Sequence, residues 1–152
     1  MLVYLDEQID NSDERLRAFE RVCRENGLSI TPQRVVIYKE LISSGQHPSA
    51  VMIFNSVRKY LPNISLDTVN RTLQTFHKIG LAKLVESSGD PKRFDPNLEP
   101  HHHFRCLECG KIVDFKNPSY DALEIPAQIA KRFVVVEQVV HLEGYCDVCK
   151  SR

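Results

Sequence analysis

Apolar residues recur at helical spacing through the first half of the chain and predict four helices. The first is expected over residues 13–26, with Ser12 as its cap and Gly27 as its stop. Its apolar face includes Cys23, so we expect this cysteine to be a core residue and not a ligand. The second helix is expected to begin at Thr31-Pro32, a cap followed by a proline at the first helical position.

Two further helices follow, and the second of them has a polar face. Ser49 is expected to begin the third helix, which continues to Leu61. Ser65 is expected to cap the fourth, which Gly80 ends. Arginine, asparagine and glutamine can make paired hydrogen bonds to base edges in the major groove of DNA. The polar face of the fourth helix carries such side chains: Asn70, Arg71, Gln74 and Lys78.

After Gly80 the pattern changes from helices to a hairpin. Residues 81–86 are predicted to form a strand, residues 87–91 a turn and residues 92–94 a returning strand. Helices followed by a hairpin with a basic end, here Lys92 and Arg93, are typical of a winged helix-turn-helix domain that binds DNA. The alternative is a small helical domain whose polar helix is simply solvated.

The rest of the chain predicts a second, smaller domain of mixed α/β type. Strands are expected over residues 101–106, 111–115 and 133–142, the third of them buried on at least one face, with a helix over residues 120–131. A domain as short as residues 101–152 usually needs a metal or a partner chain to be stable. The predicted fold class is therefore α/β (α+β), with a winged-helix domain over 1–94, a hinge over 95–100 and an α/β domain over 101–152.

Composition and charge narrow the possible partners and locations. The net charge is zero, with 42% hydrophobic and 26% charged residues, which is a globular composition. Residues 15–93 nevertheless carry about twice as many basic as acidic side chains, a distribution suited to DNA or to an ordinary mixed surface. No apolar run is long enough to span a membrane, and no signal peptide is visible, so a cytoplasmic location is expected.

Four cysteines form two C-x-x-C pairs, Cys106 with Cys109 and Cys146 with Cys149. Two such pairs on tight turns can place four sulfurs around one zinc ion, and Gly110 suits the turn after the first pair. Two redox-active pairs or an iron–sulfur centre are the competing interpretations. A structural zinc that holds the small domain together is the favoured one.

A run of three histidines leads into the first cysteine pair. On a strand, His101 and His103 share one face and His102 points to the other. If the chain folds back as a hairpin in which Cys106 faces Cys109, then Asp114 lies opposite His101 and on the same face as His103. Two imidazoles and a carboxylate would suit a ferrous, manganous or zinc ion better than calcium or magnesium. A surface tract of histidines is the alternative.

Taken together, these features resemble the ferric uptake regulator family over nearly the whole chain. The matching pieces are Ile30-Thr-Pro-Gln-Arg34, His47-Pro-Ser-Ala50, Leu61-Pro-Asn-Ile-Ser65, Thr68-Val-Asn-Arg-Thr-Leu73 and His101-His-His-Phe-Arg-Cys-Leu-Glu-Cys-Gly-Lys-Ile-Val-Asp-Phe115. The last piece is highly specific. The resemblance implies a homodimeric transcriptional repressor that binds a double-stranded DNA operator and is not an enzyme, with a C-terminal domain for dimerisation.

The resemblance also implies a regulatory metal site with ligands on both sides of the hinge. Its positions correspond to His47, Asp95, His101, His103 and Asp114, holding Fe2+ or Mn2+ beside the structural Zn2+. The ion would favour the operator-binding arrangement of the two domains. A further metal site of some iron sensors matches only Pro100, His102, Asp121 and Gln138, a poor ligand set, and His77 and His141 are expected to be surface or core residues.

Asp114 points to the peroxide-responsive branch of the family, because iron sensors usually carry glutamate there. In that branch peroxide oxidises a histidine ligand, by resemblance His47 or His101. No cysteine lies between Gly80 and Arg105, which argues against the zinc-sensing branch. One departure is Asn70, which replaces a DNA-contacting tyrosine and affects the expected operator.

Three alternatives to a peroxide sensor remain at this point. One is an iron-responsive uptake repressor of the same family. Another is a metal-dependent hydrolase or oxygenase that uses His101, His103 and an acid, although no pocket signature accompanies them. The third is a zinc-dependent interaction module without a DNA role.

Overall fold

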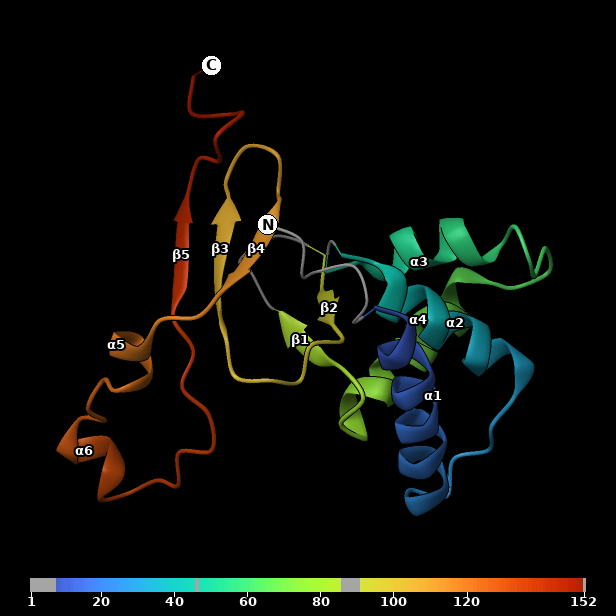
Figure 1. Ribbon diagram of the computed structural model, residues 1–152, viewed down its shortest axis with the longest axis horizontal. Coiled ribbons are helices and arrows are strands. Elements are labelled where there is room, and N and C mark those ends of the chain that lie inside the picture. The colour runs from blue at the N-terminus through green and yellow to red at the C-terminus, as the bar shows by residue number, and fades with distance from the viewer. Residues whose placement is uncertain (1–7, 46, 86–90, 152) are drawn as a thin grey trace. The chain divides into compact units, whose positions relative to one another are not determined.

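The computed structural model describes residues 8–45, 47–85 and 91–151. The chain divides into two compact units, Met1–Leu98 and Glu99–Arg152. Unit 1 contains α1 to α4 and the hairpin β1–β2, and unit 2 contains β3, β4, α5, α6 and β5 (Figure 1). None of the described helices is long and apolar enough to cross a membrane.

The four predicted helices of unit 1 are present with altered ends. Their bounds are α1 Gln8–Glu25, α2 Pro32–Ser43, α3 Ala50–Val57 and α4 Leu66–Lys78. The prediction that Ser12 caps α1 is wrong, because α1 already runs through this position. A serine inside a helix costs only a few tenths of a kcal/mol, so a serine alone does not start one. The third helix ends before Leu61, whose amide instead bonds the Val57 carbonyl in a closing turn at 2.9 Å.

The predicted caps of the other three helices are confirmed. The Thr31, Ser49 and Ser65 side chains each accept a hydrogen bond from the amide of the residue three positions on. Such a cap satisfies an amide that has no partner within the helix. Three local signals therefore determine where α2, α3 and α4 begin.

Replacing Ser65 with alanine is expected to destabilise unit 1 by about 1 kcal/mol, because the Thr68 amide loses its acceptor. Urea unfolding followed by helical circular dichroism measures this difference. Ser65→Asp, which can still accept from the same amide, is the control and should unfold close to the wild-type midpoint. Equal midpoints for Ser65→Ala and the wild type would show that this cap is not needed.

Three aromatic rings from three helices form the centre of the unit 1 core. Phe19 of α1 stacks on Tyr38 of α2 with ring centroids 4.5 Å apart, and Phe76 of α4 meets both rings edge-on at 5.7 and 5.9 Å. Phe19 and Phe76 are fully buried, and so is the neighbouring Cys23, as expected for a core cysteine. This contact fixes α4 against α1 and α2, with its polar face outward.

The predicted hairpin is present as β1, Lys83–Val85, and β2, Arg93–Asp95, paired antiparallel with Lys83 opposite Asp95. Most of its predicted turn, residues 86–90, lies outside the described residues. The returning strand reaches Asp95, the residue expected to begin the hinge. Phe94 is fully buried in the core of unit 1, and this burial carries the strand one residue further.

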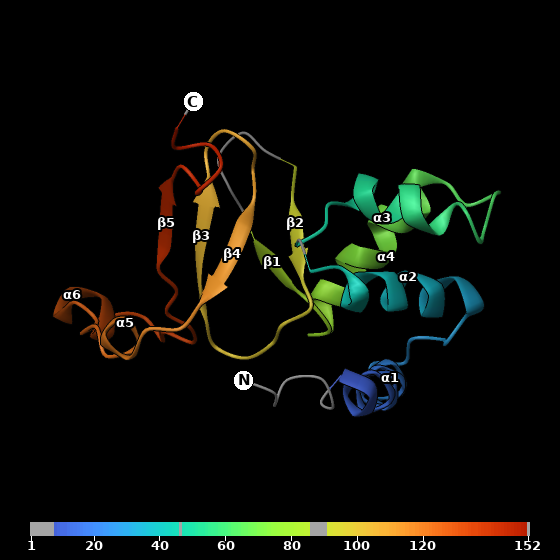
Figure 2. The ribbon, with the colours of Figure 1, turned by 45° about the horizontal axis from the view of Figure 1, so that its top comes forward.

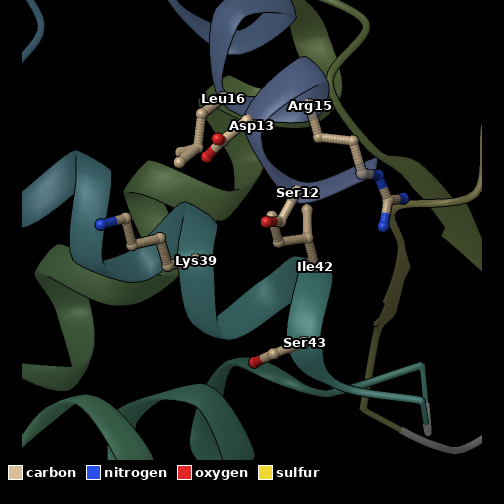
Figure 3. Close-up of a pocket in the computed structure, with 7 residues that line it drawn as sticks. All are labelled: Ser12, Asp13, Arg15, Leu16, Lys39, Ile42 and Ser43. Atoms are coloured by element: carbon tan, nitrogen blue, oxygen red, sulfur yellow. The ribbon is translucent and has the colours of Figure 1, made fainter. Parts of the chain in front are cut away.

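A groove lies between α1 and α2, and Arg15 is one of the residues that line it (Figure 3). The Arg15 guanidinium donates to the Pro96 carbonyl at 3.0 Å, while the Arg15 carbonyl accepts from the Tyr38 hydroxyl at 3.3 Å. The first bond ties α1 to the residue that follows Asp95, and the second ties α1 to α2.

Unit 2 is built on a three-stranded sheet of order β4-β3-β5 (Figure 2). The strands are β3 His102–Cys106, β4 Ile112–Phe115 and β5 His141–Gly144, with β4 antiparallel and β5 parallel to β3. The helix predicted over residues 120–131 is wrong: two four-residue helices occur, α5 Pro118–Asp121 and α6 Ala127–Ala130. Pro126 separates them, because proline has no amide hydrogen to continue a helix.

The third strand of unit 2 is shorter than predicted. It begins at His141, and the valine-rich residues before it are not in a strand. The expected burial is also wrong for this segment, since Val134 is 90% and Val136 93% exposed. Apolar composition indicated that the segment is buried, but no other part of the described chain covers it.

Candidate metal centres

The four paired cysteines come together at one end of the unit 2 sheet. The Sγ atoms of Cys106, Cys109, Cys146 and Cys149 all lie within 4.8 Å of one another. Zinc at about 2.3 Å from each sulfur of a tetrahedron sets neighbouring sulfurs about 3.8 Å apart. The Cys109 and Cys146 sulfurs are 3.8 Å apart, which is the spacing that two zinc ligands need.

The local backbone prepares these thiols to bind a cation. Hydrogen bonds from the amides of Cys109 and Cys146 lower the pKa of the Cys106 thiol to about 6. The hydrogen bond with Cys146 raises the pKa of the Cys149 thiol to about 12. Without a cation the Cys106 thiol therefore ionises readily and the Cys149 thiol resists ionisation, whereas a bound divalent ion would stabilise thiolates. The cysteine cluster thus has the donors of a structural zinc site.

A His–Asp pair lies within unit 1, at the end of β2. The His47 Nε2 atom is 3.3 Å from an Asp95 carboxylate oxygen, and both side chains are buried. The other Asp95 oxygen accepts from the Asn97 amide at 2.8 Å, which orients the carboxylate. A buried imidazole and a buried carboxylate that face each other can offer two donors to a divalent metal ion.

The backbone explains why residues so distant in sequence meet here. The Pro48 carbonyl accepts from the Phe94 amide at 2.9 Å, and Ser49 forms a β-bridge with Arg93. The loop before α3 is thus paired along β2, one strand residue for each loop residue. His47 and Asp95 lie at matching ends of this pairing.

A second set of donors, the His–His–Asp triad, lies on the sheet of unit 2. It consists of His101, His103 and Asp114. The two Nε2 atoms are 2.9 Å apart, and each is 3.4 Å from the same Asp114 oxygen. Ligands at about 2.1 Å from an ion lie about 3.0 Å apart in an octahedron and 3.4 Å apart in a tetrahedron. The three donor atoms therefore have the spacing that one cation requires.

A backbone carbonyl selects the tautomer of His101. Its Nδ1 atom is 2.6 Å from the Glu99 carbonyl oxygen, which can only accept, so Nδ1 carries the hydrogen. In the neutral ring the lone pair is then on Nε2, the atom that faces His103 and Asp114. Metal-binding histidines are commonly oriented in this way by a carbonyl behind the ring.

The predicted hairpin register is wrong by two positions. Asp114 pairs with His103, not with His101, and Arg105 pairs with Ile112. The reason is the cysteine turn: the Gly110 amide bonds the Cys106 carbonyl, and Gly110 has a φ of +71°, so Lys111 and not Cys109 faces Cys106. A shift of two keeps every side chain on its face, which is why the triad forms nonetheless.

His102 points to the opposite face of the sheet, as predicted from strand alternation. Its Nδ1 accepts from the Val140 amide at 3.1 Å, and its Nε2 is 3.0 Å from an Asp121 oxygen. Both ring nitrogens therefore have protein partners, and His102 joins β3 to α5 and to the segment before β5.

The other two histidines, His77 and His141, lie in different units. His77 contacts the Ala82 carbonyl through Nδ1 at 3.1 Å, at the end of α4. His141 lies beside the His–His–Asp triad, since it pairs with His103 across β5 and stacks on that ring at 5.3 Å. Burial lowers the pKa of His141. Sequence reasoning missed this neighbour because the third strand was placed too early.

The predicted DNA-contacting residues lie on α4, at the start of β2 and, for Lys92, just before β2. Asn70, Arg71 and Lys78 are exposed on α4 and Gln74 is half-buried, while the Arg71 guanidinium pairs with Asp67 at 2.9 Å. In the β1–β2 hairpin, Lys92 is exposed. Arg93 is half-buried, and its Nε donates to the His47 carbonyl. Arg93 thus contacts a predicted metal ligand.

Comparisons with known proteins agree with this arrangement. The family model described as "Ferric uptake regulator family" matches residues 25–143. The peroxide-responsive repressor PerR of Staphylococcus epidermidis is 37% identical over 95% of this chain and 96% of its own length. PerR of Staphylococcus aureus is 35% identical over 95% and 98%.

Solved structures give the same result. The Helicobacter pylori ferric uptake regulator, whose structure reveals three functional metal binding sites, matches with a TM-score of 0.77 and 26% identity over 91% of this chain and 93% of its own. The chain therefore belongs to the ferric uptake regulator family.

Proposed function

We propose that peroxide is the signal for this metal-dependent repressor, and that a ferrous ion detects it. The ion would bind His47 and Asp95 of unit 1 together with His101, His103 and Asp114 of unit 2. The observation that carries the proposal is the spacing of the His–His–Asp triad, with Asp114 as its carboxylate. Both staphylococcal relatives are named peroxide-responsive repressors, which supports the same signal.

The donor set favours ferrous or manganous ions. It offers three imidazoles and two carboxylates and no thiolate, a combination suited to borderline divalent metals. The thiolates lie in the separate cysteine cluster, which suits zinc. The cysteine cluster would therefore bind the structural zinc, and the imidazoles and carboxylates would bind the regulatory iron or manganese.

Metal binding would control DNA binding through the two units. An ion that needs ligands from both units binds the arrangement that brings all five together more tightly than any other. Its differential affinity shifts the population toward that arrangement, in which the two domains are held for operator binding. Loss of the ion, or damage to one ligand, removes this bias.

Peroxide would act on the ligands themselves. Hydrogen peroxide is the two-electron oxidant, and ferrous iron held by these residues would promote cleavage of its O–O bond without being consumed. One oxygen atom is inserted at a ring C–H of His47 or His101, and the other leaves as water. Each oxidised imidazole is a poorer donor. Because His101 Nε2 faces both other members of the triad, its oxidation disrupts that half of the site directly.

The partners we propose are an operator in double-stranded DNA and a second copy of the chain, in the cytoplasm. The exposed face of α4 would enter the major groove with Asn70, Arg71, Gln74 and Lys78, while Lys92 contacts the backbone. In unit 2, β5 is an edge strand, and exposed Phe133, Val134 and Val136 precede it. An apolar segment at a sheet edge is suited to pairing with a second subunit.

Operator binding in the presence of each metal tests this function. We expect the manganese and ferrous forms to bind DNA of the chain's own promoter, and chelator to release it. Peroxide should release only the ferrous form, and mass spectrometry should find one added oxygen atom on peptides that contain His47 or His101. The peroxide-treated manganese form is the matched control and should stay bound.

Two results would contradict the proposal in different ways. Equal binding with chelator present would remove the metal dependence altogether. Metal-dependent binding that survives peroxide, with unmodified histidines, would instead identify an iron-responsive uptake repressor. A metal-dependent hydrolase or oxygenase has no support from the relatives, which are named as regulators.

A further inference from the structure

The loop that carries His47 is held against β2 by three successive contacts. The Arg93 Nε donates to the His47 carbonyl, the Phe94 amide donates to the Pro48 carbonyl at 2.9 Å, and Asp95 faces the His47 ring at 3.3 Å. Residues 93, 94 and 95 each take part. The strand therefore fixes both the backbone and the side chain of this predicted ligand.

His47 needs such support because its backbone is strained. Its φ of +50° lies in the left-handed region, and it is the one non-glycine residue with a positive φ in the described part of the chain. Such a conformation persists only where the surrounding structure holds it. A relaxed φ would turn the imidazole away from its place opposite Asp95.

Arg93 has the surroundings of a structural contact. Its side chain is half-buried, and burial lowers the pKa of the guanidinium. Its Nε hydrogen is directed at the His47 carbonyl. Lys92, the adjacent residue, is exposed. The two basic residues of this arm, which sequence reasoning treated alike as DNA contacts, thus have different environments.

We propose that Arg93 is a positioning residue for the regulatory metal: by bonding the His47 carbonyl it holds this ligand in its strained, metal-ready conformation. The same residue lies on the arm of the hairpin, so it links metal binding to the wing. The inference rests on the proposed function, since it takes His47 as a ligand of the regulatory ion. In this proposal the main role of Arg93 is to orient His47, and not to contact a DNA phosphate.

Manganese titration of the zinc-loaded full-length protein tests this role without DNA. Arg93→Gln and Arg93→Lys should bind Mn2+ roughly 10- to 100-fold more weakly than the wild type, the usual loss when a group that orients a ligand is removed. Free Mn2+ can be followed by its electron paramagnetic resonance signal. Lys92→Gln, which removes the neighbouring exposed charge, should leave the Mn2+ affinity of the free protein unchanged.

Operator binding at saturating Mn2+ separates the two roles further. Arg93→Lys keeps a positive charge but loses the Nε donor and its fixed geometry. If Arg93 orients His47, this variant keeps the wild-type salt dependence of DNA binding while needing more Mn2+. A phosphate contact at Lys92 predicts the opposite for Lys92→Gln, namely weaker operator binding and a salt slope reduced by about one.

The outcomes distinguish this inference from the proposed function. If the wild type binds no Mn2+ beyond its zinc, the proposed function itself fails. If the wild type binds Mn2+ and both Arg93 variants bind it equally well, only the inference is overturned. Thermal unfolding confirms that each variant is folded, and a folded Arg93→Lys variant is sufficient for the decision.

Discussion

Replacement of His101 with alanine is expected to abolish metal-dependent operator binding, with a loss on the order of 100-fold in the operator affinity measured in Mn2+. His101 Nε2 faces both His103 and Asp114, and its tautomer is selected by the Glu99 carbonyl. Without this ring the triad loses a central donor. The affinity in chelator should be unchanged, so the ratio of the two affinities is the quantity to measure.

His77→Ala provides a matched control for this prediction. His77 is also a histidine with a carbonyl partner, but it lies at the end of α4. Its replacement can alter DNA affinity, yet the ratio between Mn2+ and chelator should stay at the wild-type value. A wild-type ratio for His101→Ala would show that this residue does not bind the regulatory ion.

Replacement of Cys146 with serine is expected to release zinc and unfold unit 2. The buried core of this unit consists of Cys106, Cys146 and Cys149, with Phe104 packed against them. A core so small depends on the ion, and structural zinc binding contributes on the order of 10 kcal/mol in small domains. Zinc content and amide hydrogen exchange of β3 and β4 measure the two effects.

Cys23→Ala is the control for the cysteine replacement. Cys23 is fully buried among the helices of unit 1 and is not part of the cysteine cluster. This variant should lose stability in unit 1 and retain its zinc. Retention of zinc and of exchange protection by Cys146→Ser would contradict a structural role for the ion.

Local signals were sufficient for most of unit 1. A cap side chain acts within three residues of itself, so Thr31, Ser49 and Ser65 could be identified from sequence as the starts of three helices. The register of β3 and β4 could not. It depends on how many residues the cysteine turn takes, and the positive φ of Gly110 adds a residue pair to that turn.

Burial in unit 2 was harder to predict for a different reason. Hydrophobicity shows that residues 133–136 favour an apolar environment, but not which molecule provides it. Within the described chain they are exposed, so the rule that apolar runs are core strands placed β5 too early. The second subunit of the proposed dimer would provide that environment.

The two donor groups of the candidate site also differed in how well the sequence alone could predict them. Alternation along a strand places His101 and His103 on one face, and any even shift of register keeps Asp114 with them. The pairing of His47 with Asp95 has no such local signal, and only family resemblance suggested both residues. The structure provides the physical reason, which is the attachment of the loop to β2.

The left-handed backbone at His47 also limits how this protein can evolve. Asparagine, aspartate and histidine are the non-glycine residues that adopt such a conformation most readily. All three carry hard or borderline donors, and cysteine is not among them. Substitutions that this backbone tolerates would therefore keep an oxygen or nitrogen donor near Asp95 and exclude a thiolate. Under the proposed function, the backbone conformation, and not only selection on the side chain, would help to conserve a preference for iron or manganese over zinc.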